Sequence, residues 1–369
     1  MKIKQISFYA FRDDKGATGG PGGVLYLQKK FLGPKYNNLN MRYVFKIKNK
    51  IIRKLFRKLF NDSYKGAIAQ VLALELFRFH NYYICNDIGS AYALSLLGKK
   101  YSLIYHQQGP IVEERVNFGA QLSTRQKKFL QKIEQRAFSK AQSVHFPSHG
   151  AQDMFFNSKY CTCKKENVNI GMVLPNTIEV EPQDSTTVNK CLTFFSCGTL
   201  TSAKGQDQSI AFIRKFLTSY KKPIKYIVVG DGVLHDSLLS EYNKLKSENP
   251  NFDFEYHSKL PHDEIIKIAN TCDIYIMLHR ISIFDLATLE AMSQSCAIIL
   301  SDVGGNKDFN IDDNAILVDV KNMDKAIERL LKTDIEYLKQ KNKEVFIEHF
   351  SPKPFKNYLQ TLIKGLNNV

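Results

Sequence analysis

Short apolar runs alternate with segments of helical periodicity along most of the chain, which predicts strands and helices that follow one another. In the first half, the expected strands are 3–10, 82–85, 101–105 and 143–146, and the expected helices are 67–79, 89–97 and 125–141. In the second half, the expected strands are 191–195, 225–229, 252–256, 273–278 and 297–300, and the expected helices are 206–220, 233–247, 262–270, 285–294 and 323–332. This pattern is typical of parallel sheets covered by helices on both faces, so the expected fold class is α/β.

A polar stretch without periodicity, residues 174–189, lies between the two halves and contains two prolines. We therefore expect an N-terminal Rossmann-like domain at 1–176 and a C-terminal one at 190–349. The segment 350–369 has a double-proline break followed by helical apolar spacing, so we expect a helix that packs back on the N-terminal domain. Ligands of open α/β domains bind at the carboxyl ends of the strands, and the two domains are expected to face a cleft.

Composition and charge narrow the classes of protein. The chain has 369 residues, of which 44% are hydrophobic and 24% charged, and these values exclude disorder of the whole chain. The 52 lysines and arginines exceed the 36 acids by 16 charges, which favours nucleotides, polyphosphates, nucleic acid or an acidic membrane face as partners. The seven cysteines form no disulfide pattern, and the sequence shows no signal peptide and no run of about 18 apolar residues. A cytoplasmic location is therefore expected.

The clearest chemical unit is the predicted strand, loop, helix and strand of residues 273–306. A helix that begins near Asp285 directs its first N–H groups and the positive end of its dipole toward the preceding loop, which can hold a phosphate without a metal. Glu290 lies about one and a half turns into that helix, in a mostly apolar segment where an unpaired carboxylate is costly. A ligand diol or a cation would satisfy this carboxylate.

This unit resembles the C-terminal signature of the retaining glycosyltransferases of family 4, through LEAM at 289–292, the apolar strand after it and SDVGG at 301–305. Further matches follow in the order of the family: PNTI at 175–178, GTLTSAKG at 198–205 and VGDG at 229–232. The resemblance is firm over about 170–350 and looser before it. It implies the two-domain GT-B fold and a nucleotide-diphosphate sugar as substrate.

The resemblance also implies roles for single residues. Glu290 would hold the ribose hydroxyls, and Lys204 would neutralise the diphosphate. The other donor-site positions are Gly230, the backbone of Phe284, Asp285 and Leu286 at the phosphate, and Gly304 and Gly305, which allow close approach of the backbone. A leaving diphosphate gains negative charge as the glycosidic bond breaks, so an ammonium and helix N–H groups would stabilise the transition state more than the ground state.

The chain departs from the family pattern at three positions. Ser282 stands where the family has a first glutamate, Asp285 where it often has a glycine, and Thr199 where it has an arginine. Asp285 either supplies the missing carboxylate or acts as the N-cap of the helix. Thr199 stays in the expected donor site, and Arg280 is expected to replace the missing guanidinium.

Two features of the first half are expected to bind the donor as well. The glycine-rich run 16–23, with Gly19 and Gly20, follows the first strand and resembles the family's glycine loop over the donor; the alternative is a flexible turn. His106 ends an apolar strand, where the family has a histidine on the donor sugar; the alternative is a structural histidine. The charged run Glu113, Glu114 and Arg115 either shapes the acceptor side or forms a solvated face.

Residues 42–60 carry eight cations and no acid, interleaved with apolar residues at helical spacing. They form either a basic amphipathic helix on an anionic membrane surface or a domain helix with solvated lysines. No zinc pattern, RNA-binding aromatic pair or helix-turn-helix signature accompanies the charge, so nucleic acid is not expected as a partner. HExxH, paired CxxC and Asp-x-Asp motifs are also lacking in the sequence, so we expect no metal and no cofactor.

The sequence therefore predicts a metal-independent, retaining glycosyltransferase that uses a nucleotide-diphosphate sugar of the hexosyl or N-acetylhexosaminyl type. Its acceptor would be a saccharide or a lipid-linked molecule in bacterial-type surface glycan synthesis. The enzyme would be cytoplasmic, or peripheral on the inner face of the membrane. A catalytically silent GT-B subunit that binds a glycan or a partner is the alternative, and a nucleic-acid binder is a weaker third.

Overall fold

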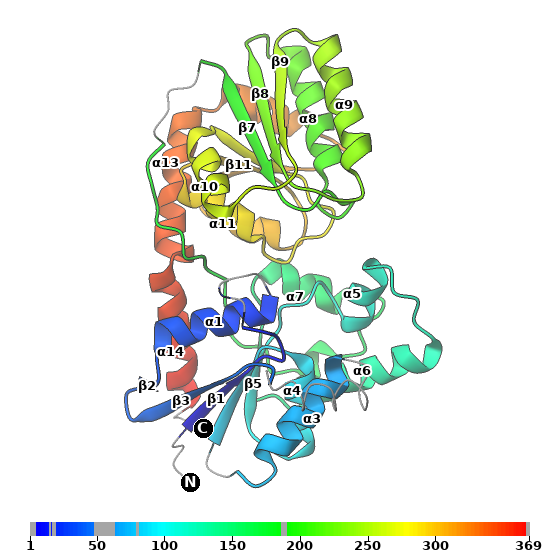
Figure 1. The fold of residues 1–369 in the computed structure, drawn as a ribbon, viewed down its shortest axis with the longest axis vertical. Coiled ribbons are helices and arrows are strands. Elements are labelled where there is room, and N and C mark those ends of the chain that lie inside the picture. The colour runs from blue at the N-terminus through cyan, green and yellow to red at the C-terminus, as the bar shows by residue number, and fades with distance from the viewer. Residues whose placement is uncertain are drawn as a thin grey trace. The chain divides into compact units, whose positions relative to one another are not determined.

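The computed structural model describes residues 5–14, 16, 20–47, 63–78, 81–185 and 190–366. The chain divides into two compact units, each of which is described by itself: unit 1 comprises Met1–Asn176 and Pro352–Val369, and unit 2 comprises Thr177–Ser351. Each unit contains a sheet of six strands and several helices (Figure 1). The α/β class predicted from the sequence is confirmed.

The sheet of unit 1 has the strand order β2-β3-β1-β4-β5-β6, and all neighbours are parallel except the antiparallel pair β2 and β3. Its strands are β1 (Gln5–Tyr9), β2 (Lys35–Tyr36), β3 (Leu39–Val44), β4 (Asn81–Cys85), β5 (Tyr101–Ile104) and β6 (Ser143–His145). Its helices are α1 (Gly20–Leu32), α3 (Ser63–Glu75), α4 (Ile88–Leu96), α5 (Ile111–Asn117), α6 (Thr124–Ser139), α7 (His149–Phe156), the 3-10 turn η1 (Lys165–Asn167) and α14 (Pro352–Leu366).

Helix α14, from the C-terminal end of the chain, belongs to unit 1. Its apolar residues Phe355, Leu359 and Ile363 are buried in the same core cluster as Val24 and Leu25 of α1. Their spacing of four residues places them on one face of the helix, as the sequence pattern indicates. The last helix thereby completes the core that begins with the first strand and the first helix.

The expected amphipathic helix at 42–60 is wrong at its start. Residues 42–44 belong to strand β3, which pairs in parallel with β1, and residues 48–60 lie outside the described residues. The reason is an alternation with a period of two, in which the side chains of Leu39 and Met41 are buried and that of Asn40 is exposed. The cations that follow hide this alternation in the sequence.

The sheet of unit 2 is entirely parallel, with the order β12-β11-β10-β7-β8-β9. Its strands are β7 (Leu192–Cys197), β8 (Ile224–Val229), β9 (Phe252–His257), β10 (Ile274–Met277), β11 (Ala297–Ser301) and β12 (Ala315–Val318). Its helices are α8 (Gln206–Ser219), α9 (His235–Glu248), α10 (His262–Thr271), α11 (Leu286–Ser293), the 3-10 helix η2 (Gly304–Phe309), α12 (Asp324–Lys332), α13 (Ile335–Val345) and the π-helical turn η3 (Phe346–Phe350).

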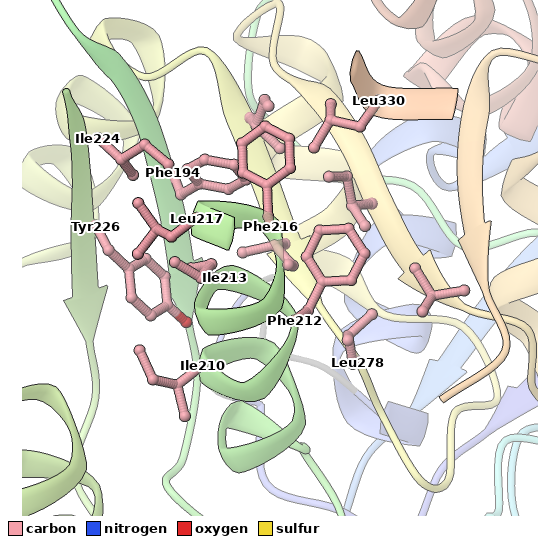
Figure 2. Close-up of a cluster of buried hydrophobic side chains, with 14 of the residues drawn as sticks. Phe194, Ile210, Phe212, Ile213, Phe216, Leu217, Ile224, Tyr226, Leu278 and Leu330 are labelled. Carbon is pink, nitrogen blue, oxygen red and sulfur yellow. The ribbon is translucent and has the colours of Figure 1, made fainter. Parts of the chain in front are cut away.

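Apolar clusters cover both faces of this second sheet. On one face, Ile213 and Phe216 of α8 pack with Phe194 and Tyr226 of the sheet (Figure 2). On the other face, α11 contributes Leu289 and Met292 to a cluster that also contains Phe284 and Phe309. Since both faces are covered, the loops at the carboxyl ends of the strands are left to form a site.

The sequence predicted most of these elements within a few residues, but it missed several others. The missed elements are α1, β2, β3, α5, α7, β12 and α13. No helix in the described ranges has both the length and the apolar character that crossing a bilayer requires.

Candidate functional site

Two loops of unit 2 cross so closely that glycine is required at the crossing points. Gly205 has φ +71° and a Cβ added there would lie 1.8 Å from the carbonyl oxygen of Leu278. Gly230 has φ +152° and its Cβ would lie 1.9 Å from the carbonyl oxygen of Gly198. The first approach brings the loop after β7, which carries Lys204, against the end of β10, and the second brings the ends of β7 and β8 together.

Lys204, His279 and Asp285 meet in this region, which we call the Lys204 cluster. The Nζ atom of Lys204 donates to Oδ1 of Asp285 at 2.6 Å and lies 3.3 Å from Nε2 of His279. The same Nε2 atom lies 3.5 Å from Oδ1 of Asp285. The carboxylate and the imidazole are buried, whereas 31% of the Lys204 side chain is exposed. Lys204 therefore has the most exposed side chain of the cluster.

The charges of the cluster stabilise one another. Burial alone would raise the pKa of Asp285, but Lys204 and His279 outweigh it and hold that pKa well below the ordinary value. Burial opposes the charge of Lys204 too, and the carboxylate of Asp285 more than compensates, so the pKa of Lys204 is raised. The cluster consequently holds a charged ammonium and a charged carboxylate at neutral pH.

Asp285 is also the N-cap of helix α11. Its Oδ2 atom accepts the backbone N–H of Thr288 at 3.0 Å, the hydroxyl of Thr288 at 3.1 Å and the hydroxyl of Tyr275 at 3.2 Å. The N-cap interpretation of this residue is confirmed. One carboxylate thus orders the start of the helix with one oxygen and holds the ammonium of Lys204 with the other.

Glu290 lies on α11, five residues after the cap. Its Oε1 atom is 2.9 Å from Nε2 of His262, the first residue of α10, and 20% of the Glu290 side chain is exposed. The hydrogen bond to Glu290 raises the pKa of His262. The carboxylate that the sequence left without a partner therefore has a histidine beside it and remains partly accessible.

The remaining predicted positions of unit 2 lie around the start of α11. The hydroxyl of Ser282 is buried and has no hydrogen-bond partner among the described residues, while its carbonyl oxygen accepts the N–H of Gly305 at 2.8 Å. Gly304 begins η2 with φ +47°. The ring of Phe284 stacks on Phe309 at a centroid distance of 4.5 Å, so this side chain belongs to the core. Leu286 is the first residue of α11.

The guanidinium of Arg280 is already engaged. It donates two hydrogen bonds to the carboxylate of Asp207, at 2.8 and 2.6 Å, and a third to the carbonyl oxygen of Ser202 at 2.8 Å. Thr199, where the family has an arginine, is exposed. In this arrangement Arg280 supports the loop of Lys204 rather than offering a free guanidinium.

Unit 1 has a polar pocket of about 150 Å³ at the carboxyl ends of its strands. Its polar lining residues are Arg12, Tyr64, Asn86, Asp87, His106, Gln107 and Glu114, and Gly20 and Pro21 of α1 also line it. Both ring nitrogens of His106 are buried without a partner in the described part of the chain. Burial lowers the pKa of His106 to about 4, so the ring is neutral at pH 7 and offers one donor and one acceptor.

The other predicted residues of unit 1 divide between this pocket and its surroundings. Gly20 begins α1 with φ +79°, whereas Gly19 lies outside the described residues. Glu114 accepts from Nε2 of Gln107 at 3.0 Å, and burial raises its pKa. Arg115 lies over the ring of Tyr64 at 4.8 Å, and Glu113 lies beside Gly109. Glu114 is thus a lining residue rather than part of a solvated face.

His279 is the functional candidate that the sequence analysis missed. It stands two residues after the end of the buried strand β10, as His106 stands two residues after the end of β5, and this shared position is the signal that could have found it. Within the described ranges, no three His, Cys, Asp or Glu side chains are grouped so that they could hold a metal ion.

Comparisons with known proteins agree with this picture. Residues 177–348 match the family model described as "Glycosyl transferases group 1", which covers nearly all of unit 2. No curated protein sequence matches the chain. The resemblance to glycosyltransferases is therefore confirmed for unit 2 at the level of this broad family.

Solved structures match over almost the whole chain. A sucrose-phosphate synthase from Thermosynechococcus elongatus has a TM-score of 0.68 at 14% identity, and the match covers 98% of this chain and 99% of that one. The E. coli trehalose-6-phosphate structure bound with UDP-2-fluoro glucose has a TM-score of 0.66 at 12% identity, covering 99% of each. A trehalose-6-phosphate synthase studied for glycosyltransfer with retention has a TM-score of 0.64 at 12% identity, covering 98% and 99%. These likenesses establish the fold, two parallel-sheet α/β domains of the GT-B type, as predicted.

Proposed function

We propose that this chain is a glycosyltransferase that takes its sugar from a nucleotide-diphosphate donor. The observation that carries the proposal is the Lys204 cluster at the start of α11, with Glu290 farther along the same helix. A partly exposed ammonium at a helix start suits a diphosphate, and a partly exposed carboxylate suits the ribose diol. The family match of residues 177–348 supports this assignment.

Lys204 would contact the diphosphate while Asp285 holds it in place. An ammonium has three N–H donors, of which Asp285 takes one at 2.6 Å. A second donor is available to a phosphate oxygen. Because the ammonium is held before the reaction starts, it stabilises the charge that develops on the leaving diphosphate without reorganisation.

Glu290 would bind the ribose while it keeps its contact with His262. A carboxylate accepts about four hydrogen bonds, so one bond to His262 leaves room for two hydroxyls. The hydrogen bond to His262 also fixes the rotamer of the carboxylate. This pre-ordering reduces the entropy lost when the nucleoside binds.

The pocket of unit 1 would bind saccharide hydroxyls. The neutral imidazole of His106 has two unsatisfied nitrogens there, and the amide oxygen of Gln107 is unsatisfied as well among the described residues. Hydroxyls donate and accept at once, so they can satisfy these groups without introducing charge. Gly20 at the edge of the pocket leaves room for the ligand beside the start of α1.

The finer features of the reaction follow from the resemblance and the neighbours. One matching structure holds UDP-2-fluoro glucose, and another was studied for glycosyltransfer with retention, which supports a retained anomeric configuration and a hexosyl or N-acetylhexosaminyl donor. We propose that no metal or cofactor takes part. The acceptor would be a saccharide or lipid-linked molecule of bacterial-type surface glycan synthesis, reached from the cytoplasm or the inner membrane face.

A panel of nucleotide sugars tests this proposal directly. Thermal unfolding is followed with UDP, GDP, CMP and dTDP sugars, because a ligand that binds the folded state raises the midpoint. Each sugar that raises the midpoint is then incubated with the enzyme, and hydrolysis or transfer is measured with and without EDTA. We expect one nucleotide class to bind, to turn over and to be insensitive to EDTA. The proposal would be contradicted if none of the nucleotide sugars raised the midpoint.

A catalytically silent subunit is the second candidate, because Asp285 neutralises the ammonium that the diphosphate needs and Ser282 and Thr199 replace charged residues of the family pattern. The same panel separates the two. A silent protein responds to a glycan in thermal unfolding but neither hydrolyses nor transfers any sugar, whereas an enzyme slowly hydrolyses its donor even without the acceptor.

A further inference from the structure

The positive charge of the protein is confined to unit 1. Residues 1–176 and 352–369 contain 32 lysines and arginines and 10 acids, whereas residues 177–351 contain 20 and 26. Unit 1 thus carries a net charge of +22 and unit 2 a net charge of −6. The Lys204 cluster lies in unit 2, which is acidic, so a nucleotide bound there does not account for the positive charge of unit 1. An anionic partner of unit 1 remains to be found.

Helix α6 of unit 1 presents a row of cations to the solvent. Its buried residues are Leu130, Ile133, Glu134, Ala137 and Phe138. Arg125, Lys128 and Lys132 follow one another at spacings of three and four residues on the opposite side of the helix and are exposed. Glu134 is the single acidic residue of the helix, and it is buried, so the outer face carries no compensating charge.

The cations of this row have no partners within the described chain. Arg125, Lys128 and Lys132 form no ion pair with any described residue. Unit 2 is different, since most of its exposed helices carry pairs such as Arg214 with Glu241 at 2.7 Å. Like charges at these spacings destabilise a helix. The capping box of Ser123 and Gln126 stabilises the start of α6 and offsets part of this repulsion. Such an uncompensated row indicates an external anion.

Large apolar side chains are also exposed on α6 and on or next to α4 and α5, the two helices that pack against it. Phe129 lies on α6 itself and is 39% exposed, and Phe118, just after α5, is 74% exposed. Leu96 is 45% exposed at the end of α4, next to Ser95, whose hydroxyl accepts from Arg136 of α6. A soluble polyanion would use the cations but would leave these side chains in water. An anionic bilayer interface accommodates cations at its headgroups and aromatic rings just below them.

We propose that the outer face of α6, with Phe118 and Phe129, docks unit 1 on an anionic phospholipid membrane. The partner is identified by the combination of unpaired cations and exposed rings, and by the charge of the whole unit. The residues of this surface are different from residues 42–60, for which the sequence suggested a membrane contact. The proposal does not depend on glycosyl transfer, because membrane binding is measured without donor or acceptor.

Vesicle sedimentation with the full chain tests the proposal. Vesicles of phosphatidylcholine, with and without phosphatidylglycerol, are compared for the wild type and the variant Arg125→Gln/Lys128→Gln/Lys132→Gln. The control variant removes three exposed lysines of unit 2, as Lys222→Gln/Lys244→Gln/Lys267→Gln, and so changes the net charge equally. We expect binding to require phosphatidylglycerol, to be weakened about 100-fold by the α6 substitutions and to be unchanged in the control.

Substitution of the aromatic residues provides a second test of the proposal. Phe118→Ser/Phe129→Ser should also weaken vesicle binding while leaving binding to soluble heparin unchanged, since heparin offers charge without an apolar layer. Equal vesicle binding by the two triple variants would overturn the proposal. So would wild-type binding to heparin alone, or an aromatic variant that binds vesicles as the wild type does. Unchanged thermal midpoints and unchanged nucleotide-sugar turnover in solution would show that a loss of binding is not a loss of folding.

Discussion

The ammonium of Lys204 lies 2.6 Å from the carboxylate of Asp285, which also caps helix α11. The two residues are 81 positions apart in the sequence, so this contact fastens the loop after β7 to the start of α11. The ammonium of Lys204 is therefore held in place by the start of α11, and the start of α11 is in turn stabilised by the ammonium. The two functions of Asp285 can be separated by substitution.

Replacement of Asp285 by Asn should preserve the cap and remove the charge, whereas replacement by Ala should remove both. Asn caps helices about as well as Asp, and loss of a cap costs about 1 kcal/mol. We therefore expect Asp285→Ala to be less stable than Asp285→Asn by about that amount, measured as the free energy of unfolding in urea. Equal stability of the two variants would mean that the hydrogen bond to Thr288 contributes little.

Replacement of Lys204 by Met should weaken nucleotide-sugar binding and should also lower the free energy of unfolding, because the buried carboxylate of Asp285 loses its cation. A hydrogen bond to a charged group contributes about 1.5–3 kcal/mol, which corresponds to roughly 10- to 150-fold in affinity. Calorimetric titration with the nucleotide found in the panel measures the change. The matched control is Lys222→Met, which removes an exposed lysine of the same unit and should bind as the wild type does. Equal losses in both variants would indicate a general effect of charge.

Replacement of Glu290 by Ala should abolish the preference for ribose. If the carboxylate binds the diol, the wild type should prefer a ribonucleotide to its 2′-deoxy analogue, and the variant should bind both with similar, weak affinity. The variant His262→Gln leaves the carboxylate in place and should keep part of the preference. A wild type that binds both nucleotides equally would show that Glu290 does not contact the ribose.

Replacement of Gly205 by Ala should destabilise unit 2 strongly. The added Cβ would lie 1.8 Å from the carbonyl oxygen of Leu278, and φ is +71°, so crowding and backbone strain together cost about 3 kcal/mol or more. The control is Gly365→Ala in α14, where nothing lies within 4 Å and a gain of up to about 1 kcal/mol is expected from helix propensity. The free energy of unfolding measures both. A mild effect at Gly205 would mean that the loop of Lys204 can move away.

The periodic parts of the fold were predictable from the sequence because burial imposes a pattern on them. The apolar stripe of α8 and the buried runs of β10 and β11 identify their elements without any knowledge of neighbours. Strand β3 was not predictable in this way. Its alternation is short and is followed at once by a run of cations with helical spacing, which gave the stronger signal.

The candidate site was predictable in its parts but not in its connections. Lys204 stands in a strand-to-helix loop, Asp285 at the start of a helix and Glu290 within that helix, and the sequence locates all three places. The sequence does not show that Arg280 pairs with Asp207, or that His279 lies beside Lys204, because these contacts join loops more than 70 residues apart. Side-chain pairing across loops depends on the tertiary fold, which no local pattern encodes.

The buried imidazole of His106 should make the protein less stable in mild acid. In the folded chain, burial lowers the pKa of His106 to about 4, whereas an unfolded histidine has a pKa near 6.5. Between these values the unfolded state binds a proton that the folded state does not, so this residue lowers the free energy of unfolding as the pH falls, by up to about 3 kcal/mol.

The variant His106→Asn has no such group and should lose less stability over the same range. His145, whose pKa burial also lowers, is present in both proteins, so its effect cancels in the comparison. Urea unfolding at several pH values from neutral to mildly acid measures the two curves. Curves that stay parallel down to pH values near 4 would show that His106 takes up a proton in the folded state as readily as in the unfolded one, so that burial does not lower its pKa.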